Sequence, residues 1–228
     1  MSQQSIAERL ESVRERIALA SVRAGRSPAD VRLIAVSKTQ PVDAIREAYA
    51  AGQRDFGENY VQELVDKARQ LADLTELRWH MIGHLQTNKV KQVLGVASVI
   101  HTLDRVSIVR EVGKRAMGGG VVDVLVEVNV GGEESKSGAA IEEADQVVEA
   151  VREQMFEQLG LRLVGLMTVP PFDLELSVVA GHFERLRMMA EGFGLKELSM
   201  GMSHDFEEAI MHGATMVRVG TAIFGSRG

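Results

Sequence analysis

Lys38 is the residue in this chain best suited to covalent chemistry. It follows an apolar, mostly β-branched run at 33–36, and Thr-Gln-Pro comes directly after it. Such a run predicts a buried strand that ends before the proline. At the carboxyl end of a parallel strand, partial burial lowers the proton affinity of an amine, which can then attack an aldehyde. Taken alone, the segment favours the simpler interpretation of a solvated lysine at a strand end.

Two segments near the C-terminus suit the binding of a phosphate. Residues 198–205 lie between a predicted strand and a predicted helix, where glycine allows close approach and free N–H groups attract anions. Residues 218–221 end the last predicted strand and offer a guanidinium, an amide and a hydroxyl group. The loops after the last two strands of a (β/α)8 barrel form its usual phosphate site. The candidate residues are Gly201, Arg218, Gly220 and Thr221, and Ser203 or Asp205 could cap the helix.

An amine and a phosphate site together are what pyridoxal 5′-phosphate (PLP) requires, because the phosphate anchors the cofactor while the lysine binds its aldehyde. A barrel aldolase needs the same two parts for a phosphosugar, and the residues do not separate these two functions. Asn59 follows a predicted strand, either as a ligand contact or as the cap of the next helix, and the cap is favoured. His80 could stack on a flat ring or be a hydrogen-bonded residue of the barrel interior.

Composition excludes several classes of protein. The 228 residues are 45% hydrophobic, which suits one large domain with a substantial core, and we expect a single domain over 1–228. A net charge of −6 argues against a general nucleic-acid binder. The chain has no cysteine, and its six histidines show no metal-binding spacing. Neither a signal peptide nor a membrane-spanning stretch is evident, which indicates a soluble cytoplasmic protein.

Strand-like and helix-like segments alternate along the whole chain. This alternation implies parallel strands joined by right-handed crossovers, and eight such units predict a closed (β/α)8 TIM barrel of the α/β class. An open doubly wound sheet with a leading helix is the alternative. The predicted strands are 32–37, 53–57, 78–82, 97–101, 122–130, 161–167, 195–199 and 215–219.

The order of the elements has one irregularity. Too few residues follow the last predicted strand to form an ordinary helix, whereas a helical pattern precedes the first strand. Its apolar residues recur at steps of four and three, and Gly25 and Pro28 end it. We therefore expect this N-terminal helix to fill the ring position after the last strand.

Six motifs in order give the chain a strong family resemblance. Together they resemble the pyridoxal phosphate homeostasis protein family, also called the YggS/PROSC family, over nearly the whole chain. The resemblance implies a barrel similar to the N-terminal domain of alanine racemase. The motifs lie at 35–39, 56–63, 79–89, 165–168, 198–203 and 218–225.

The resemblance also implies roles for individual residues. Lys38 matches the lysine that holds PLP as a Schiff base, and Asn59 matches a residue near the cofactor ring. Arg218 matches an arginine that serves either the phosphate or the ring nitrogen. The positions that match phosphate-binding residues are Ser199, Gly201, Gly220 and Thr221.

Members of this family have no firmly assigned reaction and are thought to buffer or deliver PLP in vitamin B6 homeostasis. The resemblance therefore implies a non-catalytic, monomeric carrier whose partners are PLP and apo forms of PLP enzymes, without nucleic acid or membrane. The alternative is a PLP-dependent enzyme such as an amino-acid racemase. We expect the carrier, because alanine racemase takes a second base from a further domain and this chain ends soon after its eighth predicted strand.

Overall fold

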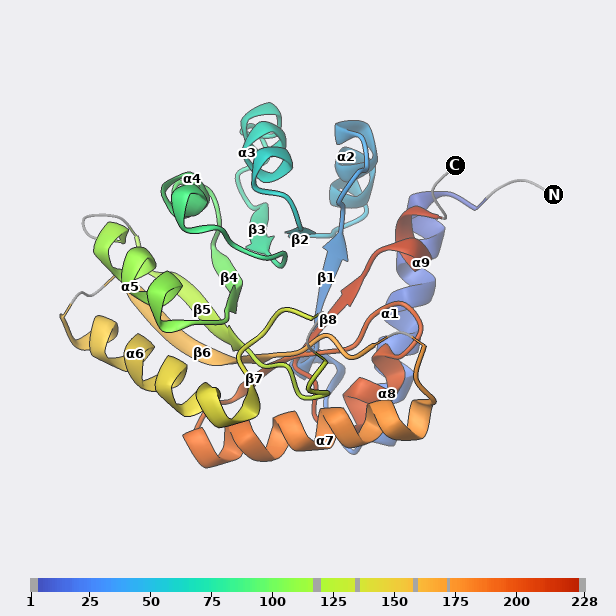
Figure 1. Ribbon diagram of the computed structural model, residues 1–228. Coiled ribbons are helices and arrows are strands. Elements are labelled where there is room, and N and C mark those ends of the chain that lie inside the picture. Colours follow the sequence, from blue (N-terminus) through green and yellow to red (C-terminus); the bar gives the residue numbers. More distant parts are fainter. Residues whose placement is uncertain (1–3, 117–119, 134–135, 158–159, 172, 226–228) are drawn as a thin grey trace.

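The chain forms a closed barrel of eight parallel strands surrounded by helices (Figure 1). The structure is a computed structural model that describes residues 4–116, 120–133, 136–157, 160–171 and 173–225. Each strand pairs with the next in sequence, and β1 closes the ring by pairing with β8 from Arg32 opposite Met216 to Ala35 opposite Val219. The strands are β1 (Arg32–Val36), β2 (Asp55–Glu58), β3 (Arg78–Met81), β4 (Val99–Leu103), β5 (Val122–Glu127), β6 (Leu161–Met167), β7 (Glu197–Ser199) and β8 (Met216–Val219).

The pairing of β1 with β8 confirms the predicted barrel and excludes the open sheet. All eight predicted strands are present, and the differences lie at their ends. The fifth was predicted over 122–130, but β5 ends at Glu127 and only Val128 makes a further isolated bridge, to Ala139. The fourth, β4, lies two residues later than predicted, although Ser98 before it already hydrogen-bonds to Trp79 and Asp123; strand ends commonly differ by one or two residues in this way.

Helices cover the outside of the barrel and bury one apolar face each against the strands. The long N-terminal helix α1 lies beside α8, α9 and α2, which confirms its predicted place in the ring (Figure 1). The α-helices are α1 (Ile6–Arg23), α2 (Val42–Ala50), α3 (Val61–Gln70), α4 (Val90–Leu94), α5 (Val106–Arg115), α6 (Ala144–Glu157), α7 (Leu176–Phe193), α8 (Phe206–Met211) and α9 (Thr221–Phe224).

Polar contacts fasten α1 to the end of the chain. Arg9 donates from Nε to the carbonyl of Ile223 at 2.6 Å. Arg16 forms an ion pair of 2.6 Å with Glu207, and its guanidinium lies 4.5 Å from the ring centre of Phe206. These contacts join the first helix to the elements around β8, so α1 seals barrel surface that would otherwise meet water.

The main core lies between the strands and the helices, and a small second cluster lies inside the barrel. The inner cluster consists of Val99, Leu125 and Met167. Polar side chains also lie in the barrel interior, including buried His80, His101 and Arg218. Among the described residues, every helix is too short or too polar to cross a lipid bilayer.

Candidate functional site

A cavity of about 290 Å³ lies at the carboxyl ends of the strands, where barrel enzymes bind ligands. Its walls come from the segments that follow β1, β2, β3, β6, β7 and β8. They carry one amine, one guanidinium, hydroxyl groups and a few apolar side chains. The lining residues are Val36, Lys38, Asn59, Ile82, Val169, Met202, Ser203, His204, Arg218, Gly220 and Thr221.

Lys38 reaches this cavity from the turn that follows β1. Its side chain is half-buried, whereas the preceding Ser37 is fully buried. The following Thr39 has a φ of 63°, a left-handed conformation that a β-branched residue rarely adopts. The Thr39 N–H donates to Glu63 Oε2 at 2.9 Å and so holds the turn in this conformation. Strain of this kind persists only where surrounding contacts hold it, and it is frequent at functional sites.

The buried amine of Lys67 stabilises the same turn through hydrogen bonds. Lys67, on α3, donates from Nζ to the carbonyl of Ser37 at 2.7 Å, to Glu58 Oε1 at 2.9 Å and to Glu63 Oε2 at 3.1 Å. Ser37 also donates from Oγ to Glu58 Oε1 at 2.7 Å. The backbone on both sides of Lys38 is therefore tied to one charged cluster, which limits the movement of the cavity amine.

Burial dominates the electrostatics of this cluster. It raises the pKa of Glu58 to about 7, although the hydrogen bonds from Lys67 and Ser37 oppose the rise. Glu58 Oε2 is buried without a hydrogen-bond partner. For Glu63, burial also acts to raise the pKa, but the Thr39 N–H, Glu58 and Lys67 outweigh it and the pKa is lowered. Near neutral pH, Glu58 can thus exchange a proton while Glu63 stays ionised.

The two C-terminal loops present donors to the opposite wall of the cavity. The N–H groups of Ser203, His204, Thr221 and Ala222 have no hydrogen-bond acceptor within the described part of the chain. The loops also bind each other, because the Gly220 N–H donates to Ser203 Oγ at 3.3 Å. Such a set of free amides and hydroxyl groups suits an anion with several oxygen atoms.

Glycine is required in the first of these loops. Gly201 has a φ of 92°, and a Cβ there would lie 2.6 Å from the Cβ of Ala209 and 2.9 Å from the Cα of Phe206. A side chain would push α8 away from the loop. Gly201 therefore shapes the loop without lining the cavity itself.

Arg218 forms the floor of the cavity and is almost fully buried. It donates from Nη1 to Ser199 Oγ at 2.6 Å and from Nη2 to the carbonyl of Thr168 at 2.8 Å. Burial lowers the pKa of this guanidinium to about 10, and the charges of Glu127 and Asp205 oppose the change. The side chain therefore stays cationic at neutral pH.

The structure brings five of the seven predicted site residues to one cavity: Lys38, Asn59, Arg218, Gly220 and Thr221. Asn59 does not cap the next helix, since the cap residue of α3 is Tyr60. Ser199 is fully buried beneath Arg218, and its expected contact with a phosphate stays a prediction. Within the described ranges, no group of three or more His, Asp or Glu residues is arranged to hold a metal ion.

Sequence reasoning missed the cluster around Lys67. The only local signal was the spacing of Glu63 and Lys67, four residues apart on one helical turn, which is common on solvated helix faces. The other partner, Glu58, lies on β2 and meets Lys67 only after α3 has packed against the barrel.

Comparisons with known proteins agree with this geometry. Residues 9–228 match the family model of the alanine racemase N-terminal domain. The chain is 46% identical over 227 residues to the pyridoxal phosphate homeostasis protein of Aquifex aeolicus, covering 96% of this chain and 97% of the relative. The protein of the same name from Escherichia coli K12 is 46% identical over 233 residues, with 97% of both chains covered.

Solved structures show the same architecture. PipY of Synechococcus elongatus, determined with PLP bound, superposes with a TM-score of 0.82 at 36% identity and covers 97% of this chain and 100% of that one. Alanine racemase from Bacillus anthracis superposes with a TM-score of 0.64 at 17% identity and covers 96% of this chain and 56% of that one. The second likeness concerns the fold alone.

Proposed function

The chain belongs to the pyridoxal phosphate homeostasis protein family, and on that premise we propose that it binds PLP and buffers or delivers it to other proteins. One observation carries the proposal. The amine of Lys38 and the donor-rich loops at 202–204 and 220–221 border the same cavity. This is the arrangement that a phosphorylated aldehyde requires, and the PipY relative, of the same fold, was determined with PLP bound.

Different residues of the cavity bind different parts of the cofactor. The Lys38 amine forms a covalent C=N bond with the cofactor's aldehyde carbon and releases water. Ser203, Thr221 and the free amides beside them hold the phosphate, while Arg218 supplies positive charge. Asn59 lines the same cavity as Lys38 and would face the cofactor ring.

A carrier is favoured over a racemase by the positions of the tyrosines. The chain has two tyrosines, and neither lines the cavity. Tyr49 lies over the guanidinium of Arg54 on the outside of the barrel, and Tyr60 is 58% exposed at the start of α3. Racemisation by two bases needs a second proton donor opposite the lysine, and neither tyrosine is placed for that role.

The proposal extends to the whole chain. Residues 1–228 act as one PLP-binding domain, a cytoplasmic monomer whose protein partners are apo forms of PLP enzymes. Neither nucleic acid nor a membrane takes part. The net charge of −6 and the single closed barrel support this description.

Chemical trapping tests the binding step. Borohydride reduction of the PLP-loaded protein, followed by peptide mapping, should place the pyridoxyl group on Lys38. Lys38→Ala should lose this label, whereas the control Lys91→Ala, which changes an exposed lysine on α4, should keep it. Label confined to surface lysines in the wild-type protein would refute the assignment.

Transfer to an acceptor tests the carrier function. The loaded protein should restore activity to an apo PLP enzyme in a stoichiometric manner, and it should show negligible racemisation of alanine. Rapid racemisation that disappears in Lys38→Ala would overturn the carrier in favour of an enzyme.

A further inference from the structure

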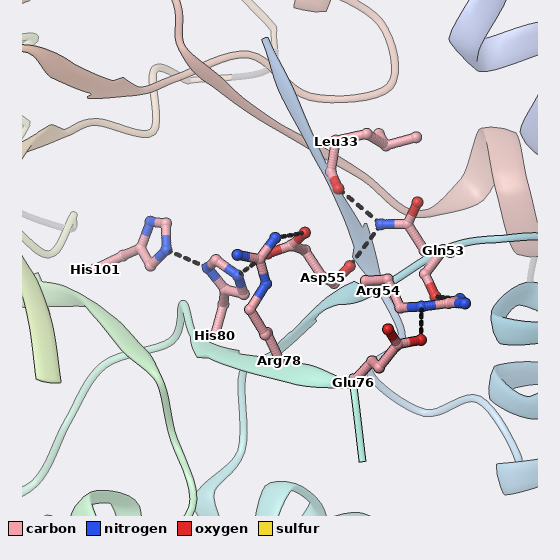
Figure 2. Close-up of polar contacts among 8 residues, drawn as sticks. All are labelled: Leu33, Gln53, Arg54, Asp55, Glu76, Arg78, His80 and His101. Atoms are coloured by element: carbon pink, nitrogen blue, oxygen red, sulfur yellow. Dashed lines mark hydrogen bonds and ion pairs between the residues drawn. The ribbon is translucent and has the colours of Figure 1, made fainter. Parts of the chain in front are cut away.

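A continuous chain of buried hydrogen bonds crosses the barrel interior beneath the cavity. Figure 2 shows its lower half, in which Asp55, His80 and His101 lie in a row. Asp55 Oδ1 lies 2.9 Å from His80 Nε2, and His80 Nδ1 lies 2.9 Å from His101 Nε2. The chain continues from His101 Nδ1 to Ser199 Oγ at 2.9 Å and ends at Arg218 Nη1, 2.6 Å further on.

We call this chain of hydrogen bonds from Asp55 to Arg218 the relay, and the residues at its two ends determine the direction in which its hydrogen bonds are donated. A guanidinium only donates and a carboxylate only accepts. Arg218 therefore donates to Ser199, and Asp55 fixes the other links when both rings are neutral. A neutral ring that donates at one nitrogen accepts at the other, so the Ser199 hydroxyl donates to Nδ1 of His101. His101 then donates from Nε2 to Nδ1 of His80, and His80 donates from Nε2 to Asp55. Both histidines must carry their proton on Nε2, and every link is satisfied.

Burial keeps both histidines neutral. It lowers the pKa of His80, although the hydrogen bond and charge of Asp55 oppose the change, and Arg32 and Arg78 lower the pKa further. Burial lowers the pKa of His101 well below its ordinary value, and His80, Arg218 and Arg32 act in the same direction. When both rings are neutral, each donates from Nε2 and accepts at Nδ1, which matches the relay.

The relay ends at an ion pair close to solvent. Arg78 donates to Asp55 Oδ2 at 2.7 Å, and about half of the Arg78 side chain is exposed, with a relative accessibility of 51%. Burial acts to raise the pKa of Asp55, but His80 and Arg78 outweigh it and the pKa is lowered. Asp55 thus provides a fixed negative charge at the amino end of the barrel.

We propose that Asp55, His80 and His101 are positioning residues for the cofactor cavity, which act on it through Ser199 and Arg218. The inference rests on the proposed function, since Arg218 is taken to face bound PLP. The relay fixes the Ser199 hydroxyl as an acceptor for Arg218 and links the guanidinium to a negative charge at the opposite end of the barrel. Hydrogen bonds in such a chain polarise one another, so a change at Asp55 is felt at Arg218.

The geometry favours a specific role over simple filling of the barrel. The relay runs past the apolar cluster of Val99, Leu125 and Met167, which shows that apolar side chains can fill this interior. Burying an aspartate and two histidines is unfavourable unless each is fully hydrogen-bonded. The residues come from β2, β3, β4, β7 and β8, and their contacts form one series that ends at Arg218.

The first test reads the relay without cofactor. ¹⁵N NMR of the histidine-labelled protein should show His80 and His101 as neutral Nε2–H tautomers. An Nδ1–H tautomer or a charged ring at either position would overturn the direction of the relay. This measurement does not depend on the binding of PLP.

The second test uses a matched pair of variants. Asp55→Asn removes the negative end of the relay and should raise the PLP dissociation constant about tenfold, the size of one hydrogen bond to a charged group. The control Asp123→Asn should change it by less than about twofold, because exposed ion pairs contribute little. Asp123 binds Arg162 from the next strand, as Asp55 binds Arg78, but it lies outside the relay.

A third variant and a spectrum separate positioning from stability. His101→Phe cuts the relay at its centre and should also weaken PLP binding, and in both relay variants the absorption band of bound PLP should shift. Unchanged affinity and spectrum in Asp55→Asn and His101→Phe would refute the inference. If the wild-type protein itself does not bind PLP, the proposed function is refuted instead. The tautomers of His80 and His101 still test the direction of the hydrogen bonds, because that measurement needs no PLP.

Discussion

The contribution of Lys67 to stability should depend on pH, and the variant Lys67→Met tests this. Lys67 is the only cation hydrogen-bonded to Glu58 within the described residues. Because burial raises the folded-state pKa of Glu58 from 4.5 to about 7, this carboxyl favours folding at low pH, and the benefit is lost as the pH rises through about 7. Above that pH, Glu58 of the wild type is ionised and paired with Lys67, so its contribution to the unfolding free energy falls no further.

Without Lys67, Glu58 must stay protonated to remain buried. The unfolding free energy of Lys67→Met then keeps falling by about 1.4 kcal/mol for each pH unit above about 7. From about pH 7 to about pH 8.5 the variant should therefore lose about 2 kcal/mol more than the wild type. A loss of about 1 kcal/mol should remain at all pH values, because the carbonyl of Ser37 no longer has its donor.

Urea denaturation at about pH 6 and about pH 8.5 measures both parts. The double variant Lys67→Met/Glu58→Gln has no buried carboxyl here, so this site should add no change to the variant's own unfolding free energy between the two pH values. The control Lys91→Met changes an exposed lysine and should stay within about 0.5 kcal/mol of the wild type. Equal destabilisation of Lys67→Met at both pH values would refute the coupling between Lys67 and Glu58.

Three further variants test other parts of the structure. Gly201→Ala should lower the unfolding free energy by more than about 2 kcal/mol, because its φ of 92° and its contact with Ala209 leave no room for a Cβ, whereas Gly192→Ala in α7 should raise it by up to about 1 kcal/mol. Burial raises the pKa of Glu127 to about 7, so the stabilisation that this carboxyl gives at acid pH is lost as the pH rises through that value. In denaturant titrations, the unfolding free energy of Glu127→Gln relative to the wild type should therefore be about 3 kcal/mol higher at alkaline than at acid pH. Leu10→Ala in the buried face of α1 should lower the thermal midpoint through a loss of 2–5 kcal/mol, about the usual range, while the exposed Leu19→Ala should barely move it. An equal effect of the two leucine changes would contradict the packing of α1 against the barrel.

The elements of this fold were predictable because their signals are local. Strands such as β1, β5 and β6 are short, largely apolar runs, and apolar periodicity marks the helical pattern before the first strand. Closure of the ring followed from the number of units and from the rules for parallel crossovers. The positions of Lys38, Gly220 and Thr221 at one end of the barrel followed as well, since the carboxyl ends of parallel strands meet there.

The contacts beneath the cavity had no such signal. The side chains of Asp55, His80, His101, Ser199 and Arg218 meet only because strand register and barrel tilt bring inward-facing positions from separate strands to one axis. Sequence spacing carries no information about that register. The contact of Ser199 with Arg218 could not be predicted for the same reason, and the family resemblance assigned Ser199 to the phosphate instead. The amino-acid sequence by itself thus determined the barrel and the amine at its mouth, whereas the tertiary structure decided which buried polar groups hold the cavity residues in place.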